Sequence, residues 1–209
     1  MSSINEVLYG DTNYLNTLKD KVNKVVNKNL KQISKEKDGD YVFTSTKLVE
    51  APMPPVKAYI GCSWFSDKQT AHMKAGIEAI KANPSVSWEY SHYPLAHQYK
   101  GMDVNKNPEI MLDKEWQMAT VSADIEGIKG CELGIMLYVP SEPDDGQAWE
   151  MGNLYGHGKQ CVVVIPDDEV HEPLNLMVAC GTTRIIKLSE LATFDFRHVV
   201  ADVYDGEVY

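Results

Sequence analysis

The sequence lacks the features that mark several large classes of protein. No apolar stretch approaches the roughly 20 residues that cross a bilayer, and the N-terminus has no apolar signal-peptide core. Its few cysteines lie far apart, without C-x-x-C spacing or a neighbouring pair of histidines, so we expect reduced, mostly core residues and no zinc site or disulfide framework. These absences favour a cytoplasmic protein.

The common fingerprints of nucleotide binding and hydrolysis are also missing. The chain has no GxGxxG dinucleotide motif, no P-loop, no HExxH and no GxSxG. Its histidines show no metal-ligand spacing, and we expect them on the surface or in loops: His72, His92, His97, His157, His171 and His198. We predict no metal and no organic cofactor.

The charge is acidic overall but unevenly distributed. The 209 residues carry a formal net charge of −10, with 44% hydrophobic and 24% charged residues, a composition typical of a globular protein. The lysine-rich stretch 1–55 is nearly balanced, so the excess of acid lies in residues 56–209. An acidic body repels phosphate backbones, which argues against a nucleic-acid partner and leaves small neutral substrates open.

The first 55 residues form an extension of different character. Apolar residues recur at helical spacing over residues 12–36, with lysines on the opposite face, which predicts an amphipathic helix. A short strand is expected at 41–46, and the proline-rich stretch 51–55 is expected to be a stiff linker. Such a helix cannot bury its apolar stripe alone, so we expect it to pack on the body or on another subunit.

Residues 56–209 alternate predicted strands with predicted helices. Strands are expected at 56–61, 86–90, 131–139, 160–165 and 184–187. Helices are expected at 67–82, from Asn107-Pro108-Glu109 to about residue 127, around Glu150, and at 174–180. This alternation predicts an α/β fold: a flavodoxin-like, doubly wound parallel sheet with helices on both faces, plus the N-terminal helical extension.

An acidic turn and a helix come directly after the apolar run 133–139. Ligands of open parallel sheets bind at the carboxyl ends of the strands, so Glu150, within two turns of the helix start, is placed to act as a nucleophile or base. The alternative is a solvated acid that complements the helix dipole. Asp144 has a similar alternative, as a simple N-cap.

Asp124 is placed against two preferences. It lies close to the apolar stripe of its helix and in the last turns, where a negative charge is disfavoured by roughly 0.3–1 kcal/mol. This position hints at a functional acid, although a buried hydrogen bond to a neighbouring loop would explain it as well. Tyr59, Trp64 and Phe65 lie on or just after the first strand of the body, where aromatic rings either stack on a flat ligand or pack in the core.

Residues 57–209 resemble the nucleoside 2-deoxyribosyltransferases. The matching pieces are Tyr59-Ile60-Gly61 with Trp64-Phe65, Pro94-Leu95 through Gln98-Tyr99-Lys100-Gly101, Asp124 with Gly127-Ile128-Lys129, Asp144-x-Gly146-x-x-x-Glu150-x-Gly152, Asn175-Leu176-Met177, and Gly206-Glu207-Val208-Tyr209. Each piece alone is weak, but six in order at family-like spacing make a specific signal.

The resemblance implies transfer of 2-deoxyribose between nucleobases, a reaction of nucleotide salvage. It makes Glu150 the nucleophile of a retaining double displacement with a covalent deoxyribosyl intermediate, as in retaining glycosidases. It makes Asp124 the partner and proton donor of the base, and Tyr59 the residue that orients Glu150.

The resemblance also assigns the substrate contacts and the assembly. Gln98 would contact the base together with Gly61, Trp64 and Phe65. Asp144 would bind a sugar hydroxyl, and the Tyr209 carboxylate would close the pocket. Asn175, with Met177 nearby, would be supplied by a neighbouring subunit of a dimer-based homo-oligomer, commonly a hexamer.

Two alternatives remain open. The first is an N-glycosidase that hydrolyses 2-deoxynucleosides or their 5-monophosphates. A phosphate about 4 Å from Asp144 would cost on the order of 4 kcal/mol at an effective dielectric of 20, which argues against the monophosphate. The second is a non-catalytic nucleotide-sensing module, which would not need a positioned Glu150.

Overall fold

The computed structural model describes residues 34–35, 41–42 and 53–209 of the chain. Contacts divide it into two compact units, Met1–Pro52 and Met53–Tyr209. In the first unit, β1 (Ser34–Lys35) pairs with β2 (Tyr41–Val42) in antiparallel fashion. The predicted helix over 12–36 is therefore wrong at Ser34 and Lys35, which form a strand. The rest of that helix, the remainder of the strand predicted at 41–46 and the start of the linker lie outside the described residues.

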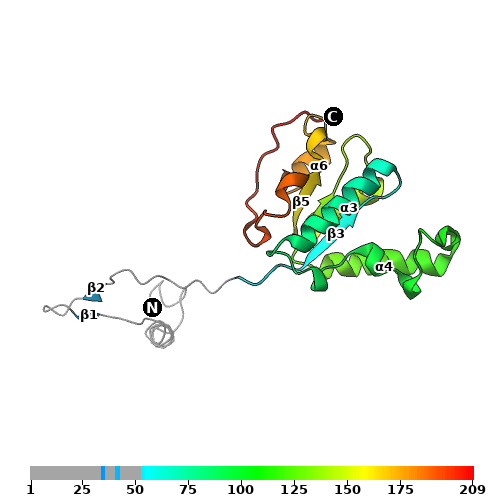
Figure 1. Ribbon diagram of the computed structural model, residues 1–209, viewed down its shortest axis with the longest axis horizontal. Coiled ribbons are helices and arrows are strands. Elements are labelled where there is room, and N and C mark those ends of the chain that lie inside the picture. The colour runs from blue at the N-terminus through cyan, green and yellow to red at the C-terminus, as the bar shows by residue number, and fades with distance from the viewer. Residues whose placement is uncertain (1–33, 36–40, 43–52) are drawn as a thin grey trace, which may run out of the picture. The chain divides into compact units, whose positions relative to one another are not determined.

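The second unit, coloured from cyan to red in Figure 1, is built on a parallel sheet of four strands. These are β3 (Ala58–Cys62), β4 (Leu133–Leu137), β5 (Gln160–Ile165) and β6 (Arg184–Lys187), in the order β3-β4-β5-β6. Every residue of β3 and β4 is buried. Strands that are buried on both faces have continuous apolar sequences and not alternating ones. This pattern is why these strands could be predicted from the sequence.

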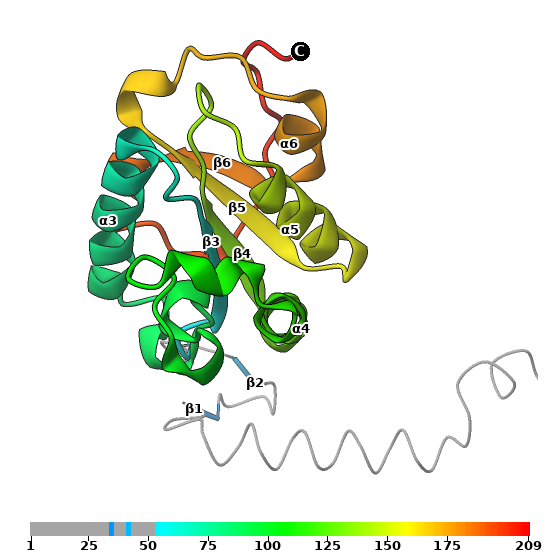
Figure 2. The same ribbon diagram turned by 90° about the vertical axis from the view of Figure 1, so that its right-hand side faces the viewer.

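Helices cover both faces of this sheet, as Figure 2 shows. On one face, α3 (Asp67–Ala82) packs against side chains such as Ile60, Ile135 and Val162. On the other face, α4 (Lys114–Gly130), α5 (Asp145–Gly156) and α6 (Leu176–Gly181) share a second cluster that includes Tyr59 and Met136. The predicted α/β fold with a doubly covered parallel sheet is confirmed.

The strand predicted at 86–90 is wrong as a regular element. Residues Trp88–Tyr90 form a 3-10 turn (η1), and the backbone pairing of this segment consists of two isolated parallel bridges, Val56 to Val86 and Tyr59 to His92. It nevertheless lies beside β3, in the position that the second strand of a flavodoxin-like order 2-1-3-4-5 occupies. The side chain of Ser91 replaces a ladder contact, since its Oγ accepts from the N–H of Ala58 at 3.0 Å.

The helix predicted to open at Asn107 is also wrong in its first turns. The segment 94–112 is a chain of 3-10 turns: η2 (Pro94–Ala96), η3 (Tyr99–Gly101) and η4 (Pro108–Leu112). Helix α4 begins only after it, where Asp113 accepts hydrogen bonds from the N–H groups of Glu115 and Trp116. Asn107 makes no side-chain cap, so the better-satisfied N-cap sets the start of the α-helix.

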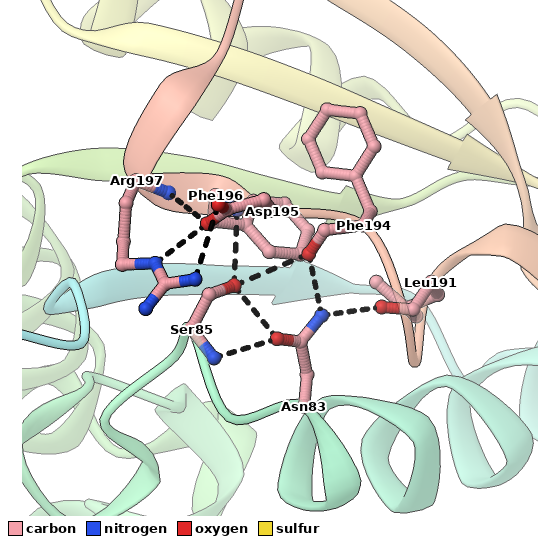
Figure 3. A network of polar contacts seen from close by, with 7 residues as sticks. All are labelled: Asn83, Ser85, Leu191, Phe194, Asp195, Phe196 and Arg197. Atoms are coloured by element: carbon pink, nitrogen blue, oxygen red, sulfur yellow. Dashed lines mark hydrogen bonds and ion pairs between the residues drawn. The ribbon is translucent and has the colours of Figure 1, made fainter. Parts of the chain in front are cut away.

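The carboxyl half of the chain is tied to the end of α3 by a buried polar network (Figure 3). Asn83, the C-cap of α3, donates to the carbonyls of Leu191 at 2.6 Å and Phe194 at 2.8 Å. Its Oδ1 accepts from both the N–H and the Oγ of Ser85, and Ser85 Oγ accepts in turn from the N–H of Phe196. The network holds the turns η6 (Leu188–Glu190) and η7 (Phe196–His198) against the α3 face.

Two predictions based on composition can be compared with this fold. Three of the four cysteines, Cys62, Cys131 and Cys161, are buried, while Cys180 is exposed, and all four are free thiols. Mostly buried, reduced cysteines were expected. Within the described ranges, no helix is long and apolar enough to span a bilayer.

Candidate active site

The strongest contact between predicted site residues joins Tyr59 to Glu150. Tyr59 lies on β3 and is fully buried, and its hydroxyl donates to Glu150 Oε1 at 2.7 Å. Glu150 lies on α5, which begins after the carboxyl end of β4, so two elements separated by 91 positions bring the pair together. The Glu150 side chain therefore points toward the sheet edge and not outward into bulk solvent.

Gly61 makes the approach of Glu150 possible. A Cβ at position 61 would lie 2.7 Å from Glu150 Oε2 and closer still to the Met136 methyl group. Real Cβ atoms essentially never make contacts this short, so a larger residue at position 61 would displace the carboxylate and the Met136 side chain. Gly61 therefore makes space for Glu150, and its predicted contact with the substrate stays a prediction.

Glu150 is held against its ionised form. Burial raises its pKa to about 8, the hydrogen bond from Tyr59 opposes that rise, and the charges of Asp124 and Asp144 add to it. Burial, followed by the charges of Glu150 and Asp124, also raises the pKa of the Tyr59 hydroxyl, which stays a donor. Three acids and a phenol therefore act on one another electrostatically at one point of the sheet edge.

Asp124 faces an imidazole that the sequence did not single out. Its Oδ1 lies 3.5 Å from His92 Nε2, and the two side chains are only 16% and 15% exposed. The His92 ring stacks on Tyr59, with centroids 5.6 Å apart and planes at 11°, and on His97, at 4.9 Å and 18°. The expectation of surface or loop histidines is wrong for His72, which is buried on α3 and bonded to the Val164 carbonyl. His92 does lie outside the helices and strands, in the segment between η1 and η2, but it is largely enclosed there.

Asp144 is an N-cap, the structural role given above as its alternative, and it also lines a cavity. It is the N-cap of α5, and its Oδ1 accepts from the N–H of Gln147 at 3.0 Å. Gly146 gives that carboxylate space, because a Cβ there would lie 2.9 Å from Oδ1. Among the described residues no hydrogen bond reaches its other oxygen, and Asp144 also lines a cavity.

This cavity, of about 630 Å³, lies between α5 and α6. It brings together four predicted substrate-binding residues, Asp144, Asn175, Met177 and Tyr209. Glu150 is not among its lining residues, although Met151, the next residue of α5, is one of them. Asn175 is the N-cap of α6, where its Oδ1 accepts from the N–H of Met177 at 2.9 Å.

The last residues of the chain are fixed to this cavity by backbone hydrogen bonds. Leu174 N–H donates to the Glu207 carbonyl, Tyr209 N–H donates to the Leu174 carbonyl, and Leu176 N–H donates to a Tyr209 oxygen, each at 3.0 Å. Tyr209 is 62% exposed at the cavity wall. The predicted position of Tyr209 at the pocket is compatible with this arrangement.

The remaining predicted contacts are less directly engaged. Trp64 packs partly on the core, which fits the core-packing alternative. Its neighbour Phe65 is 66% exposed, so its ring is free to stack on a ligand. Gln98 is occupied within its own loop, because Nε2 donates to the Leu95 carbonyl and Oε1 accepts from the Val104 N–H. Its predicted contact with a nucleobase stays a prediction.

A buried acid that no sequence pattern indicated stabilises the turn that leads into α5. Glu169 is 3% exposed and accepts from Lys68 Nζ at 2.5 Å and from the Ser141 N–H and hydroxyl at 3.0 and 2.6 Å. Burial raises the pKa of Glu169, but these hydrogen bonds outweigh it and lower the pKa below its ordinary value. The three residues are far apart in sequence, so no local pattern could have revealed them.

No group of three His, Cys, Asp or Glu side chains suited to a metal ion occurs in the part of the chain that the structure describes. The edge holds a carboxylate bound by a phenol, a second acid beside an imidazole, and a third acid at a cavity.

Comparison with known proteins gives the arrangement a context. Residues 58–181 match the family model described as nucleoside 2-deoxyribosyltransferase. A nucleoside deoxyribosyltransferase of Lactobacillus leichmannii is 40% identical over 157 residues, which cover 75% of this chain and 100% of that protein. Another, of Lactobacillus johnsonii, is 42% identical over 146 residues, covering 70% of this chain and 98% of that protein.

One solved structure supports the fold. The 2-deoxyribosyltransferase of Bacillus psychrosaccharolyticus superposes with a TM-score of 0.57 at 20% sequence identity, over 71% of this chain and 98% of that one. At this identity the likeness concerns the fold alone.

Proposed function

Since the chain belongs to the nucleoside 2-deoxyribosyltransferase family, we propose that it transfers 2-deoxyribose from one nucleobase to another. The observation that carries the proposal is the hydrogen bond from Tyr59 to Glu150 over Gly61 at the carboxyl edge of β3. A carboxylate fixed in this way is suited to attack an anomeric carbon. A plain solvated helix acid would need neither the phenol nor the glycine.

The proposed reaction has two displacements. In the first, Glu150 Oε2 forms a bond to C1 of the sugar while the bond from C1 to the base nitrogen breaks, and Asp124 gives a proton to the departing base. In the second, a nitrogen of the incoming base forms the bond to C1 and the ester bond to Glu150 breaks, while the proton of that nitrogen passes to Asp124 and restores its acid form. Two inversions give net retention.

The raised pKa of Glu150 suits this role. Burial raises the pKa of the carboxyl to about 8, so its conjugate base is more basic than an ordinary carboxylate. Burial also means that the anion is poorly solvated before it reacts. The oxocarbenium-like sugar of the transition state supplies the missing positive charge next to it.

The sugar side of the site is proposed to need a second copy of the chain. Leu174, Val178 and Ala179 of the predicted contact stretch are buried in the core, but Leu176 and Met177 are 49% and 76% exposed. Two copies packed through this surface would bury these apolar side chains and carry Asn175 toward a neighbouring site. A dimer-based assembly, with the hexamer expected from the resemblance, is the proposed state.

Base exchange with product identification tests the function. The protein is incubated with one deoxynucleoside, with and without a second base, and products are identified by mass. We expect a new deoxynucleoside only when the second base is present. Free base without a new nucleoside would instead indicate hydrolysis, the reaction of an N-glycosidase.

Two variants test the role of Glu150 in that assay. Glu150→Ala should abolish exchange, while Glu126→Ala, which changes a 71% exposed acid on α4, should not. If neither the parent nor Glu126→Ala exchanges bases while a deoxynucleoside still binds, the non-catalytic sensing module is the better account. Exchange by Glu150→Ala at the parent rate would rule out the covalent mechanism.

A further inference from the structure

His92 is built into the site from three directions, although no motif contains it. Its backbone N–H donates to the Ala58 carbonyl and its carbonyl accepts from Ile60 N–H, both at 2.8 Å, so it is fixed to β3 on either side of Tyr59. The imidazole is therefore in register with the Tyr59 ring and stacks on it. The position of the ring follows from the strand and not from a flexible loop.

Helix α4 has a glycine where it meets the His92 ring. A Cβ at Gly127 would lie 2.5 Å from both His92 Cγ and Cδ2. Glycine inside a helix costs about 1 kcal/mol relative to alanine, and here the space it leaves is filled by the imidazole. Asp124 lies one turn earlier on the same helix face, since residues three apart are neighbours.

The ring presents an unpartnered nitrogen to the acid. His92 Nε2 is inaccessible to solvent and has no hydrogen-bond partner within residues 53–209, and the facing atom is Asp124 Oδ1 at 3.5 Å. A buried polar nitrogen without a partner destabilises a fold, so shortening the distance from His92 Nε2 to Asp124 Oδ1 to that of a hydrogen bond would stabilise the site. Hydrogen bonds of catalytic groups are often long in unliganded sites and tighten when substrate binds.

We propose that His92 is a positioning residue for Asp124. This role depends on the proposed function. When a nucleoside is bound, His92 Nε2–H donates to Asp124 Oδ1, and Asp124 Oδ2 then faces the base. His97 holds the outer face of the ring, and its own orientation is fixed because Nδ1 donates to the Tyr93 carbonyl at 2.9 Å. The stack Tyr59–His92–His97 thereby links the nucleophile side of the site to the base side.

Two substitutions separate this role from simple packing. His92→Phe keeps a flat ring over Tyr59 but removes the donor, whereas His92→Gln removes the ring and keeps a donor at the position of Nε2. Positioning by the donor predicts that His92→Phe lowers kcat/KM about tenfold or more and that His92→Gln recovers most of it. A packing role predicts the reverse order.

The leaving group supplies a readout that packing would not move. The base of 7-methyl-2-deoxyguanosine is already cationic, so it departs neutral without taking a proton from Asp124. The burst of base released without acceptor measures this first step alone. We expect the deficits of His92→Phe and Asp124→Asn to persist with deoxyguanosine and to shrink to within about twofold with the methylated nucleoside, as for a lost general acid. Glu150→Ala should fail with both.

The outcomes are distinguishable. If the parent releases no base and exchanges none, the proposed function fails. If the parent is active but His92→Phe equals it, or is impaired equally with both nucleosides, the positioning role is overturned. His171→Phe, on an exposed loop, is the control for the substitution itself. Should His92→Phe not melt cooperatively, Gly127→Ala, which displaces the same ring, must show the same leaving-group dependence or the inference falls.

Discussion

Replacing Glu150 with glutamine is expected to stabilise the protein, and only above mildly acidic pH. Burial raises the pKa of this carboxyl from its ordinary 4.5 to about 8. Between these two values the folded protein keeps a proton that the unfolded chain releases, so the stability of the parent falls as the pH rises through this window. Glutamine cannot ionise, and its Oε1 can still accept from the Tyr59 hydroxyl.

The size of the effect follows from the same shift. Each pKa unit is worth about 1.4 kcal/mol, which sets an upper limit of about 5 kcal/mol. The side chain is partly exposed, so solvent reduces the effect, and we expect about 2 kcal/mol by pH 8. For a unit of this size, 2 kcal/mol corresponds to roughly 4–8 °C in Tm.

Thermal melts of parent and variant at intervals from pH 4.5 to pH 9 measure this difference. The gap in Tm should be smallest at the acidic end and widen through neutral pH, and it should be matched by loss of base exchange. Glu126→Gln, at an exposed position, should show no such pH dependence. A gap that is constant with pH, or a parent that is the more stable protein at pH 8, would refute the burial of an ionisable nucleophile.

Three further predictions concern the same site and the extension. The value of kcat/KM for exchange should rise with pH as Glu150 ionises, with a midpoint near pH 8. Tyr59→Phe should move that midpoint upward, because the hydrogen bond from Tyr59 lowers the pKa of Glu150; an unmoved or lowered midpoint would contradict this. Gly61→Ala should reduce kcat by about a hundredfold or more, since its Cβ would meet Glu150, whereas Gly156→Ala, with open space around it, should retain parent kinetics. Deleting residues 1–50 should leave transferase activity in the remaining unit but alter assembly or solubility, as measured by light scattering; a folded, inactive truncation would show that the extension serves the site.

The sequence was sufficient where buried strands and helix signals agree. The apolar runs that form β4 and β5 have the length of central strands. The Asn83-Pro84 pair ends α3 as expected. The acidic turn before α5 placed Glu150 at the sheet edge for the same reason, because a parallel sheet brings successive strand ends together. These features depend on residues that are close in sequence.

The features that the sequence did not reveal depend on residues that are far apart. An edge segment such as 86–92 needs only a few bridges to β3, so its composition does not enforce a regular strand. The proline of Asn107-Pro108 suits a 3-10 turn as well as an α-helix, and only the competing cap at Asp113 decides between them. The approach of His92 to Asp124 requires the β3 register and the missing side chain at Gly127 together, which no local spacing encodes.

The fastening of residues 207–209 to Leu174 and Leu176 has a practical consequence for handling the protein. Any peptide fused after Tyr209 must leave from the rim of the cavity that Met177 and Asp144 line. Affinity tags therefore belong at the opposite terminus, where they are remote in sequence from every residue of the proposed chemistry. A small fluorophore attached beyond Tyr209 would, by contrast, serve as a sensor, because its emission would report when a nucleoside or a second copy of the chain occupies that rim.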